Sequence, residues 1–230
     1  MKTIGLLGGM SWESTALYYK QINEEVKNKL GSLHSAKIVM YSVDFDEIEK
    51  LQHNGKWDET AFILSEAAKN IENASADFLI ICTNTMHKVA PQIQENINIP
   101  IVHIADATAK VLQKDNIKKV GLIATAFTME EDFYKNRIRE NFGIEVVVPN
   151  EEDIKTIHKI IYEELCLGLV KEESKKEYLR IIDKLVKSGV EGIILGCTEI
   201  CMLISPKDTP VKLYNTTEIH TNEAVNLALA

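Results

Sequence analysis

Two segments of the chain share a pattern in which an apolar run, expected to be a buried strand, ends in small polar residues. The first segment covers residues 77–85 and the second covers residues 191–199. In this alignment Thr83 and Cys197 occupy matching positions, 114 residues apart. Since this offset is about half of the 230 residues, the chain is expected to consist of two similar halves.

The rest of the chain alternates between apolar runs and helical stretches. Residues 3–7 recur as residues 119–123, at an offset of 116 residues, so each half opens with the same kind of strand. Regular alternation of this kind is typical of a mainly parallel sheet flanked by helices. The expected strands cover residues 3–7, 37–42, 77–82, 101–103, 119–124, 145–148, 192–196 and 211–214, and the expected helices cover residues 12–30, 57–73, 86–94, 105–113, 129–141, 154–167, 171–188 and 216–229.

The pattern predicts an α/β fold with two similar lobes, each a mainly parallel sheet flanked by helices, related by a pseudo-two-fold internal repeat. Pro100 and Pro210 each precede a short expected strand, a position that suits proline, and they mark the expected crossings between the lobes. The N-terminal lobe is expected to comprise residues 1–99 and 210–230, and the C-terminal lobe residues 100–209. We expect the active site in the cleft between the lobes, at the carboxyl ends of strands.

Composition and charge restrict the possible functions. The chain is 45% hydrophobic and 26% charged, which is ordinary for a soluble globular protein. A net charge of −8 disfavours nucleic acid and anionic membranes as partners, and no apolar run approaches the ~20 residues that span a bilayer. The apolar start is too short for a signal peptide. Because four cysteines make no disulfide framework and six histidines show no metal-binding spacing, a cytoplasmic protein without a metal site is expected.

Cys197 has the clearest chemical potential in the chain. It follows Gly196 at the end of an expected strand and stands where a helix is expected to start. A helix N-terminus favours thiolate over thiol, and a thiolate acts as a base or a nucleophile. The alternative interpretation is a buried structural cysteine, and the remaining thiols at Cys166 and Cys201 are expected to lie in the core on helical faces.

Two further strand ends carry polar or glycine residues. Thr83, Asn84 and Thr85 offer small polar side chains that can hold a carboxylate or an ammonium, or else cap the helix that follows. The glycine-containing turn of residues 5–14 leads through Met10 and Ser11 into a helix, where an anion can rest. The alternative there is a tight turn with Ser11 as the N-cap. The turn lacks the glycine spacing of nucleotide-binding loops, and Thr125 ends a third strand in a similar way.

These residues also carry a family resemblance. Residues 196–199 read Gly-Cys-Thr-Glu, and residues 83–87 read Thr-Asn-Thr-Met-His where the family usually has C-N-T-x-H. With the segments 5–15 and 43–48, the chain resembles the aspartate/glutamate racemases, and most of all the branch specific for L-aspartate and L-glutamate. The resemblance implies a cofactor-independent enzyme, commonly a homodimer, that acts on a small amino acid through an acid and a base on opposite sides of the α-carbon.

The chain departs from the family at several positions. Thr83 stands where the first catalytic cysteine is expected, and the adjacent Cys82 is expected to point into the core, because neighbouring side chains of a strand face opposite ways. The resemblance therefore assigns the main acid/base role to Cys197 on the L isomer, with Thr83 opposite. Leu51 and Gln52 occupy the region where aspartate racemases tend to carry an arginine, and Cys166 lies where they tend to carry a lysine. Substrate contacts are implied for Met10, Ser11, Gln52, Asn84, Thr85, Thr125, Glu164, Thr198 and Glu199.

Two other functions remain open from the sequence. One is a related isomerase or decarboxylase of another small carboxylic acid, such as maleate or an arylmalonate. The other is a non-catalytic amino-acid-binding protein, because a threonine hydroxyl is a far weaker base than a thiolate. Exchange of the α-hydrogen with solvent distinguishes a racemase from a protein that only binds.

Overall fold

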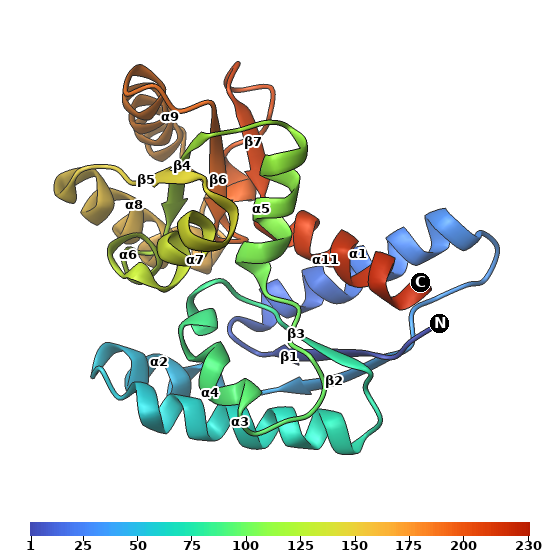
Figure 1. Ribbon diagram of the computed structural model, residues 1–230. Coiled ribbons are helices and arrows are strands. Elements are labelled where there is room, and N and C mark those ends of the chain that lie inside the picture. Colours follow the sequence, from blue (N-terminus) through green and yellow to red (C-terminus); the bar gives the residue numbers. More distant parts are fainter. The chain divides into compact units, whose positions relative to one another are not determined.

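The computed structural model describes residues 1–230, which divide into two compact units (Figure 1). Unit 1 comprises Met1–Ile104 and His220–Ala230, and unit 2 comprises Ala105–Ile219. The elements in chain order are β1 (Ile4–Gly8), α1 (Trp12–Leu30), β2 (Ile38–Ser42), α2 (Phe45–His53), α3 (Trp57–Asn73), β3 (Phe78–Ile81), η1 (Thr85–Val89), α4 (Ala90–Gln94), α5 (Ile104–Lys114), β4 (Lys119–Ala124), α6 (Ala126–Glu130), α7 (Asp132–Phe142), β5 (Glu145–Val147), α8 (Glu151–Glu163), η2 (Leu165–Leu167), α9 (Glu172–Lys187), β6 (Gly192–Gly196), α10 (Ile200–Leu203), β7 (Lys212–Asn215) and α11 (Thr216–Leu229).

Unit 1 is built on a parallel sheet with the strand order β2-β1-β3. Every residue of β1 and β3 is buried, which is why both read as continuous apolar runs. Leu7 and Ile81 pack against α3 on one face, whereas Leu6 and Ile80 pack against α1 and the end of α11 on the other (Figure 1). Helices on both faces leave the carboxyl ends of β1 and β3 as the place for polar side chains.

Unit 2 is built on a parallel sheet with the strand order β5-β4-β6-β7. The strands β4 and β6 are buried, and α8 and α9 pack against β4. A Cβ atom at Gly121 of β4 would meet the Leu185 side chain of α9 at 3.1 Å, so glycine allows this helix to approach the sheet closely.

The internal repeat of the sequence corresponds to a repeat of strand pairing. In unit 1 Leu7 of β1 pairs with Ile81 of β3, and in unit 2 Ile123 of β4 pairs with Leu195 of β6. These are the positions that the two offsets place in correspondence. The predicted α/β class, with two similar parallel sheets flanked by helices, is therefore confirmed.

The unit boundaries differ from the expected crossings at Pro100 and Pro210. The chain enters unit 2 only after Ile104, because Ile101 bridges to Leu79 of β3 and so belongs to the sheet of unit 1. This isolated bridge replaces the full strand that was expected there. The chain returns to unit 1 at His220, because β7 is paired with β6 and so belongs to the sheet of unit 2.

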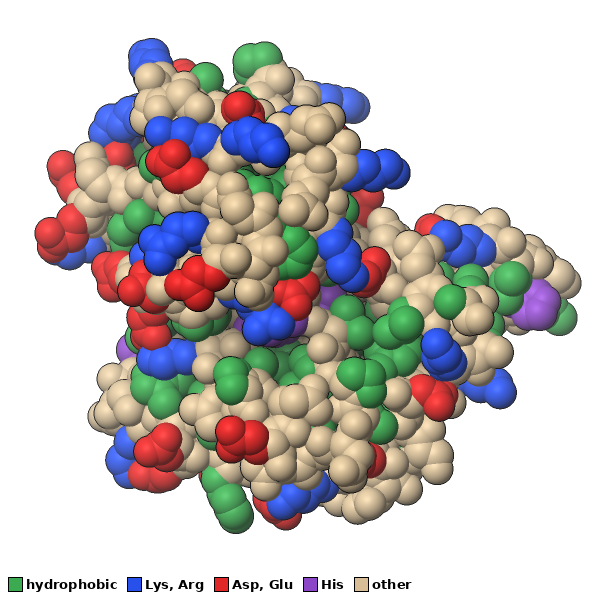
Figure 2. Space-filling model, in the orientation of Figure 1, with side chains coloured by type: hydrophobic (Ala, Val, Ile, Leu, Met, Phe, Trp, Pro, Cys, Tyr) green, Lys and Arg blue, Asp and Glu red, His purple; other side chains and the backbone are tan.

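The surface carries charges of both signs. Figure 2 shows Lys and Arg side chains interspersed with Asp and Glu side chains on the face in view. Several ion pairs of the protein join residues one helical turn apart, such as Lys50 with Asp46 and Lys155 with Glu151. None of the helices has both the length and the apolar character needed to cross a membrane.

Candidate active site

Cys197 follows β6 at the carboxyl end of the sheet of unit 2. The side chains of Cys197, Thr198 and Glu199 are half-buried, whereas β6 before them is fully buried. The Cys197 thiol donates to Glu199 Oε2 at 2.9 Å, and Thr198 Oγ1 donates to the same oxygen at 2.7 Å. One carboxylate oxygen of Glu199 therefore accepts a hydrogen bond from each of the two preceding side chains.

The surroundings hold Cys197 in its protonated form. Burial raises the pKa of the Cys197 thiol well above its usual range, and the charge of Glu199 and its hydrogen bond raise it further. The expectation of a thiolate favoured by a following helix is therefore wrong for the unliganded protein. The physical reason is that burial of the thiol, together with the nearby Glu199 carboxylate, outweighs α10, which is a single turn of four residues.

Glu164 and Cys166 lie in the same part of unit 2. Burial raises the pKa of the Tyr178 phenol. The charges of four nearby groups raise this pKa further, and these groups are Cys197, Cys166, Glu164 and Glu199. Glu164 accepts from Ser174 Oγ at 2.5 Å and from Lys171 Nζ at 3.2 Å, and these bonds keep its pKa low. Cys166 is exposed on η2, so its expected place in the core is wrong.

Thr125 lies at the end of β4, next to the strand that carries Cys197. It is buried and is the N-cap residue of α6, and its Oγ1 lies 3.2 Å from Thr128 Oγ1. The neighbouring β6 requires glycine at its own end, because a Cβ at Gly196 would meet Ala124 Cβ at 2.9 Å. The close approach of these two strands places the residues that follow them at one edge of the sheet.

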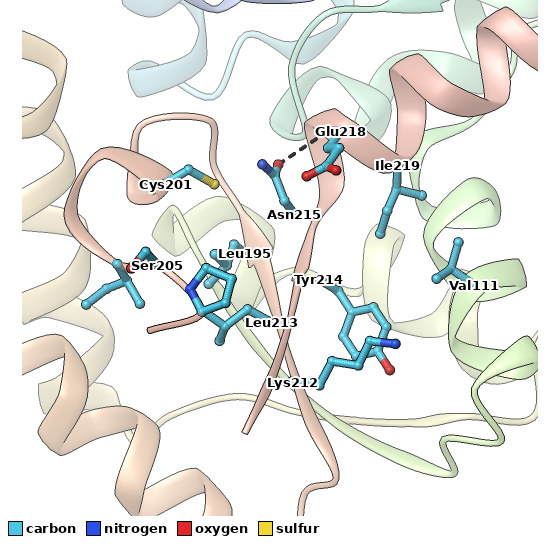
Figure 3. A pocket seen from close by; sticks show the side chains of 12 residues that line it. Val111, Leu195, Cys201, Ser205, Lys212, Leu213, Tyr214, Asn215, Glu218 and Ile219 are labelled. Carbon is cyan, nitrogen blue, oxygen red and sulfur yellow. Dashed lines mark hydrogen bonds between the residues drawn. The ribbon is translucent and has the colours of Figure 1, made fainter. Parts of the chain in front are cut away.

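A cavity of about 400 Å³ lies elsewhere in unit 2, between β7 and the loop that leads to it (Figure 3). Its lining includes Cys201, Pro206 and Leu213 but none of the predicted site residues. Cys201 is partly exposed there, which corrects its expected core position, and burial raises its pKa to about 12. The Asn215 side-chain oxygen at the cavity accepts from the Glu218 amide at 3.3 Å, as a helix cap does.

The turn between β1 and α1 in unit 1 is held by its own side chains. Gly9 has a φ of +94°, and its amide donates to Thr15 Oγ1 at 2.8 Å. Thr15 Oγ1 in turn donates to the Ser11 carbonyl at 2.9 Å. Ser11 caps α1 by accepting from the Ser14 amide at 3.2 Å, which confirms the N-cap interpretation, and Met10 is buried in the core of the unit. Thr15 is a supporting residue to which sequence reasoning gave no role.

Thr83 emerges from the carboxyl end of β3. Its side chain is half-buried, whereas Cys82 is fully buried against α1 and α11, as expected from strand alternation. Burial raises the pKa of Cys82, so that this thiol stays protonated. Asn84 and Thr85 follow, both buried, where η1 begins.

Gln52 also belongs to unit 1, on the short helix α2, which sequence reasoning missed. Its side chain is only 2% exposed, and its Nε2 has no hydrogen-bond partner. A buried amide donor without a partner is costly, so this nitrogen is suited to meet an anionic ligand group.

Sequence reasoning also missed two residues that hold the Thr83 segment. Ser14 Oγ donates to the Cys82 carbonyl at 2.9 Å, and His87 Nδ1 lies 2.8 Å from the Thr83 carbonyl. A polar residue four positions after a candidate site residue was the available signal for His87. No group of three or more His, Cys, Asp or Glu side chains is arranged to hold a metal ion.

Comparisons with known proteins agree with these observations. The profile of the Asp/Glu/hydantoin racemase family matches residues 7–224. A crystal structure from Yersinia pestis, described as a candidate Asp/Glu racemase, is 51% identical with a TM-score of 0.95 and full coverage of both chains. An aspartate racemase homologue from Pyrococcus horikoshii is 38% identical with a TM-score of 0.88, again over both full chains.

A curated relative is more distant in sequence but equally complete in coverage. The broad specificity amino-acid racemase of Bacillus subtilis is 20% identical over 99% of this chain and 98% of its own length. The family profile covers both strand ends that carry Thr83 and Cys197. The chain therefore belongs to the Asp/Glu/hydantoin racemase family and is an isomerase, an amino-acid racemase.

Proposed function

We propose that the protein is a cofactor-independent racemase of aspartate or glutamate in which Cys197 is the main acid/base and Thr83 takes the place of the second cysteine. The observation that carries this proposal is the 2.9 Å contact between the Cys197 thiol and the Glu199 carboxylate. It joins a protonated thiol to a group that can accept its proton. Relatives named aspartate racemase and glutamate racemase support the substrate class.

The first step forms the base. The S–H bond of Cys197 breaks and an O–H bond forms on Glu199, along the existing hydrogen bond. Binding of an amino acid favours this step, because a positive α-ammonium group stabilises a nearby thiolate and lowers its pKa. The thiol that the unliganded surroundings keep protonated thus becomes reactive when substrate arrives.

The second step removes the α-proton. The thiolate takes it from the L isomer, so that the C–H bond breaks, an S–H bond forms and the electron pair remains at the α-carbon, delocalised into the adjacent carboxylate. Return of a proton to the opposite face, from the Thr83 hydroxyl or a water that it holds, gives the D isomer. Thr83 then regains a proton from solvent, and Glu199 releases to solvent the proton that it took from Cys197, so that all three groups return to their starting states.

Recognition of the substrate follows from small polar groups in both units. Ser11, Asn84 and Thr85 in unit 1 are suited to a carboxylate or an ammonium, as are Thr125 and Thr198 in unit 2. We propose that both sets act on one bound amino acid, with Gln52 Nε2 donating to the side-chain carboxylate in place of a cationic residue. Glu164 is then a structural anion, because Ser174 and Lys171 already occupy its oxygens.

The unequal groups predict a preference for the L isomer. Deprotonation of the D isomer would rely on Thr83, and a hydroxyl is a much weaker base than a thiolate. At equilibrium both enantiomers are present in equal amounts, so the preference appears only in the rates.

Oligomeric state and location are part of the same proposal. We propose that the protein is located in the cytoplasm, because all four cysteines are free thiols. We also propose that it forms a homodimer, because large apolar side chains of unit 1 are exposed. More than half of Trp12, Met40 and Phe62 is accessible, and burial between two copies would remove apolar surface from water. Light scattering during size-exclusion chromatography measures the state, and a monomer at micromolar concentration would contradict it.

The test is α-hydrogen exchange in D2O from each pure enantiomer of aspartate and of glutamate. The proposal expects deuterium in the L isomer and formation of the D isomer, with slower exchange from the D isomer. Ligand-induced thermal stabilisation without any exchange would show a binding protein. Turnover of maleate or an arylmalonate without exchange in amino acids would show a related isomerase or decarboxylase.

A further inference from the structure

Thr83 is held by hydrogen bonds on both of its flanking peptide groups. The peptide before it carries the Cys82 carbonyl, which accepts from Ser14 Oγ at 2.9 Å. The peptide after it carries the Thr83 carbonyl, which accepts from His87 Nδ1 at 2.8 Å. Because a peptide group is planar, fixing both planes fixes the two backbone dihedral angles of Thr83 and hence the direction of its Cα–Cβ bond.

The hydrogen-bond partners of His87 determine which of its ring nitrogens carries the hydrogen. Its other ring nitrogen, Nε2, accepts from the Ile104 amide at 3.2 Å, so Nε2 carries no hydrogen. The Thr83 carbonyl can only accept, so Nδ1 carries the hydrogen. These two partners assign a neutral imidazole with a single tautomer.

The neighbours of His87 keep the ring neutral. The side chain is 1% exposed, and the rings of His103 and His220 lie 4.5 Å and 5.7 Å from its own, centre to centre. Burial lowers the pKa of His87 well below its usual range, and the two neighbouring histidines lower it further. Nε2 therefore stays able to accept from the Ile104 amide across the physiological pH range, while Nδ1 donates to the Thr83 carbonyl.

We propose that Ser14 and His87 are positioning residues that fix the peptide planes on either side of Thr83 and so hold its hydroxyl in place for proton return. The inference rests on the proposed function, in which Thr83 serves the face opposite to Cys197. A hydroxyl that is intrinsically a weak acid gains most from being held in one orientation, because misplacement of a reacting group is costly in rate.

The test separates two fates of L-aspartate in D2O. In the first, deuterium returns from the Cys197 side and the L configuration is retained. In the second, it returns from the Thr83 side and the D isomer forms. The ratio of inversion to retention does not depend on the amount of folded protein, because loss of folded protein reduces both products equally.

Two variants remove one bond each. Ser14→Ala loses the bond to the Cys82 carbonyl, and His87→Gln loses the Nδ1 donor but can still reach the Ile104 amide. Both are expected to lower the ratio about twofold to tenfold, the range that loss of one hydrogen bond produces. The matched control is His87→Asn, whose amide nitrogen lies near the position of Nδ1, and it should keep the wild-type ratio.

A double variant tests whether the effect passes through Thr83. In a Thr83→Ala background no hydroxyl remains to be positioned, so addition of Ser14→Ala should leave the ratio unchanged. Unchanged ratios in folded Ser14→Ala and His87→Gln would overturn the positioning role while wild-type activity stands. Absence of exchange in the wild-type protein is a different result, which overturns the proposed function and this role with it.

A measurement on the wild-type protein needs no substitution. The ¹⁵N chemical shifts of the His87 ring should show a hydrogen on Nδ1 only, without titration between about pH 5 and 9. An ordinary histidine would titrate within this range, because its pKa is about 6.5. A ring that titrates near its ordinary pKa, or that carries its hydrogen on Nε2, would overturn the proposal.

Discussion

The thiol of Cys197 donates a hydrogen bond to the carboxylate of Glu199, two positions further along the chain, with 2.9 Å between sulfur and oxygen. The arrangement stores the proton on sulfur, because burial and the adjacent negative charge both disfavour the thiolate. It also places a proton acceptor, the Glu199 carboxylate, in direct contact with the thiol that we propose as the base. In the proposed mechanism, reactivity therefore depends on a change of local charge, which the ammonium group of a bound amino acid supplies.

Replacement of the thiol tests its role as the base. Cys197→Ser should reduce α-hydrogen exchange at least about a hundredfold, because loss of a general base typically costs that much. The polar groups that are proposed to bind substrate remain, so aspartate should still raise the melting temperature. Exchange measured by NMR in D2O and thermal shift measured in parallel decide the matter. Full activity in this variant would contradict the assignment.

Replacement of the carboxylate should have opposite effects on reactivity and catalysis. Burial raises the pKa of Cys197 and the charge of Glu199 raises it further. Glu199→Gln removes this second contribution, so alkylation of the thiol by iodoacetamide should begin at lower pH than in the wild-type protein. Racemisation should nevertheless fall, because the acceptor for the thiol proton is lost. The exposed carboxylate of Glu140 on α7 provides a control, since Glu140→Gln should change neither measurement. An unchanged alkylation profile in Glu199→Gln would show that Glu199 does not govern the thiol.

A second thiol should reduce the asymmetry between enantiomers. Thr83→Cys introduces a group that titrates near 8.5 when unperturbed and so ionises far more readily than a hydroxyl. Initial α-hydrogen exchange from D-aspartate should rise relative to exchange from L-aspartate. Equal initial rates from both isomers in the wild-type protein would show that Thr83 is already a competent base.

Acid should destabilise unit 1 through its buried histidines. Burial lowers the pKa of His220 to about 4, whereas an unfolded histidine titrates near 6.5. Between these values the unfolded chain binds a proton that the folded chain does not, so the free energy of unfolding falls as pH drops from 6.5 towards 4. The loss from this one residue should be about 3 kcal/mol, fully recovered above pH 6.5.

Urea denaturation at several pH values measures this effect. His220→Asn should lower stability at neutral pH, because its bonds to Tyr18 and to the Val102 carbonyl are disturbed, yet flatten the pH dependence. His34→Gln, at an exposed position, should leave the dependence as in the wild-type protein. An equally steep dependence in His220→Asn would assign the effect to other groups.

The fold was largely predictable because strands buried on both faces read as apolar runs. The core strands β1, β3, β4 and β6 were all expected, and so was the location of Thr83 and Cys197 at two of their ends. Near Ile101 an isolated bridge replaces the expected strand. The helix α2 was not predicted, although Asp44 is a typical N-cap residue whose side chain accepts from the Asp46 amide at 3.1 Å. Short elements at the margin of a sheet carry too few residues for periodicity to distinguish them.

The sequence by itself determined the two parallel sheets, the strand ends that carry the polar residues and the family, because burial patterns and motifs are local properties of the chain. Only the tertiary structure decided that Cys197 is protonated beside Glu199, that Cys166 is exposed, and that Ser14 and His87 hold the peptides around Thr83. A pKa depends on desolvation and on charges brought close by folding, and the Ser14 contact joins residues 68 positions apart. Such properties arise from neighbours in space, which the order of residues alone does not display.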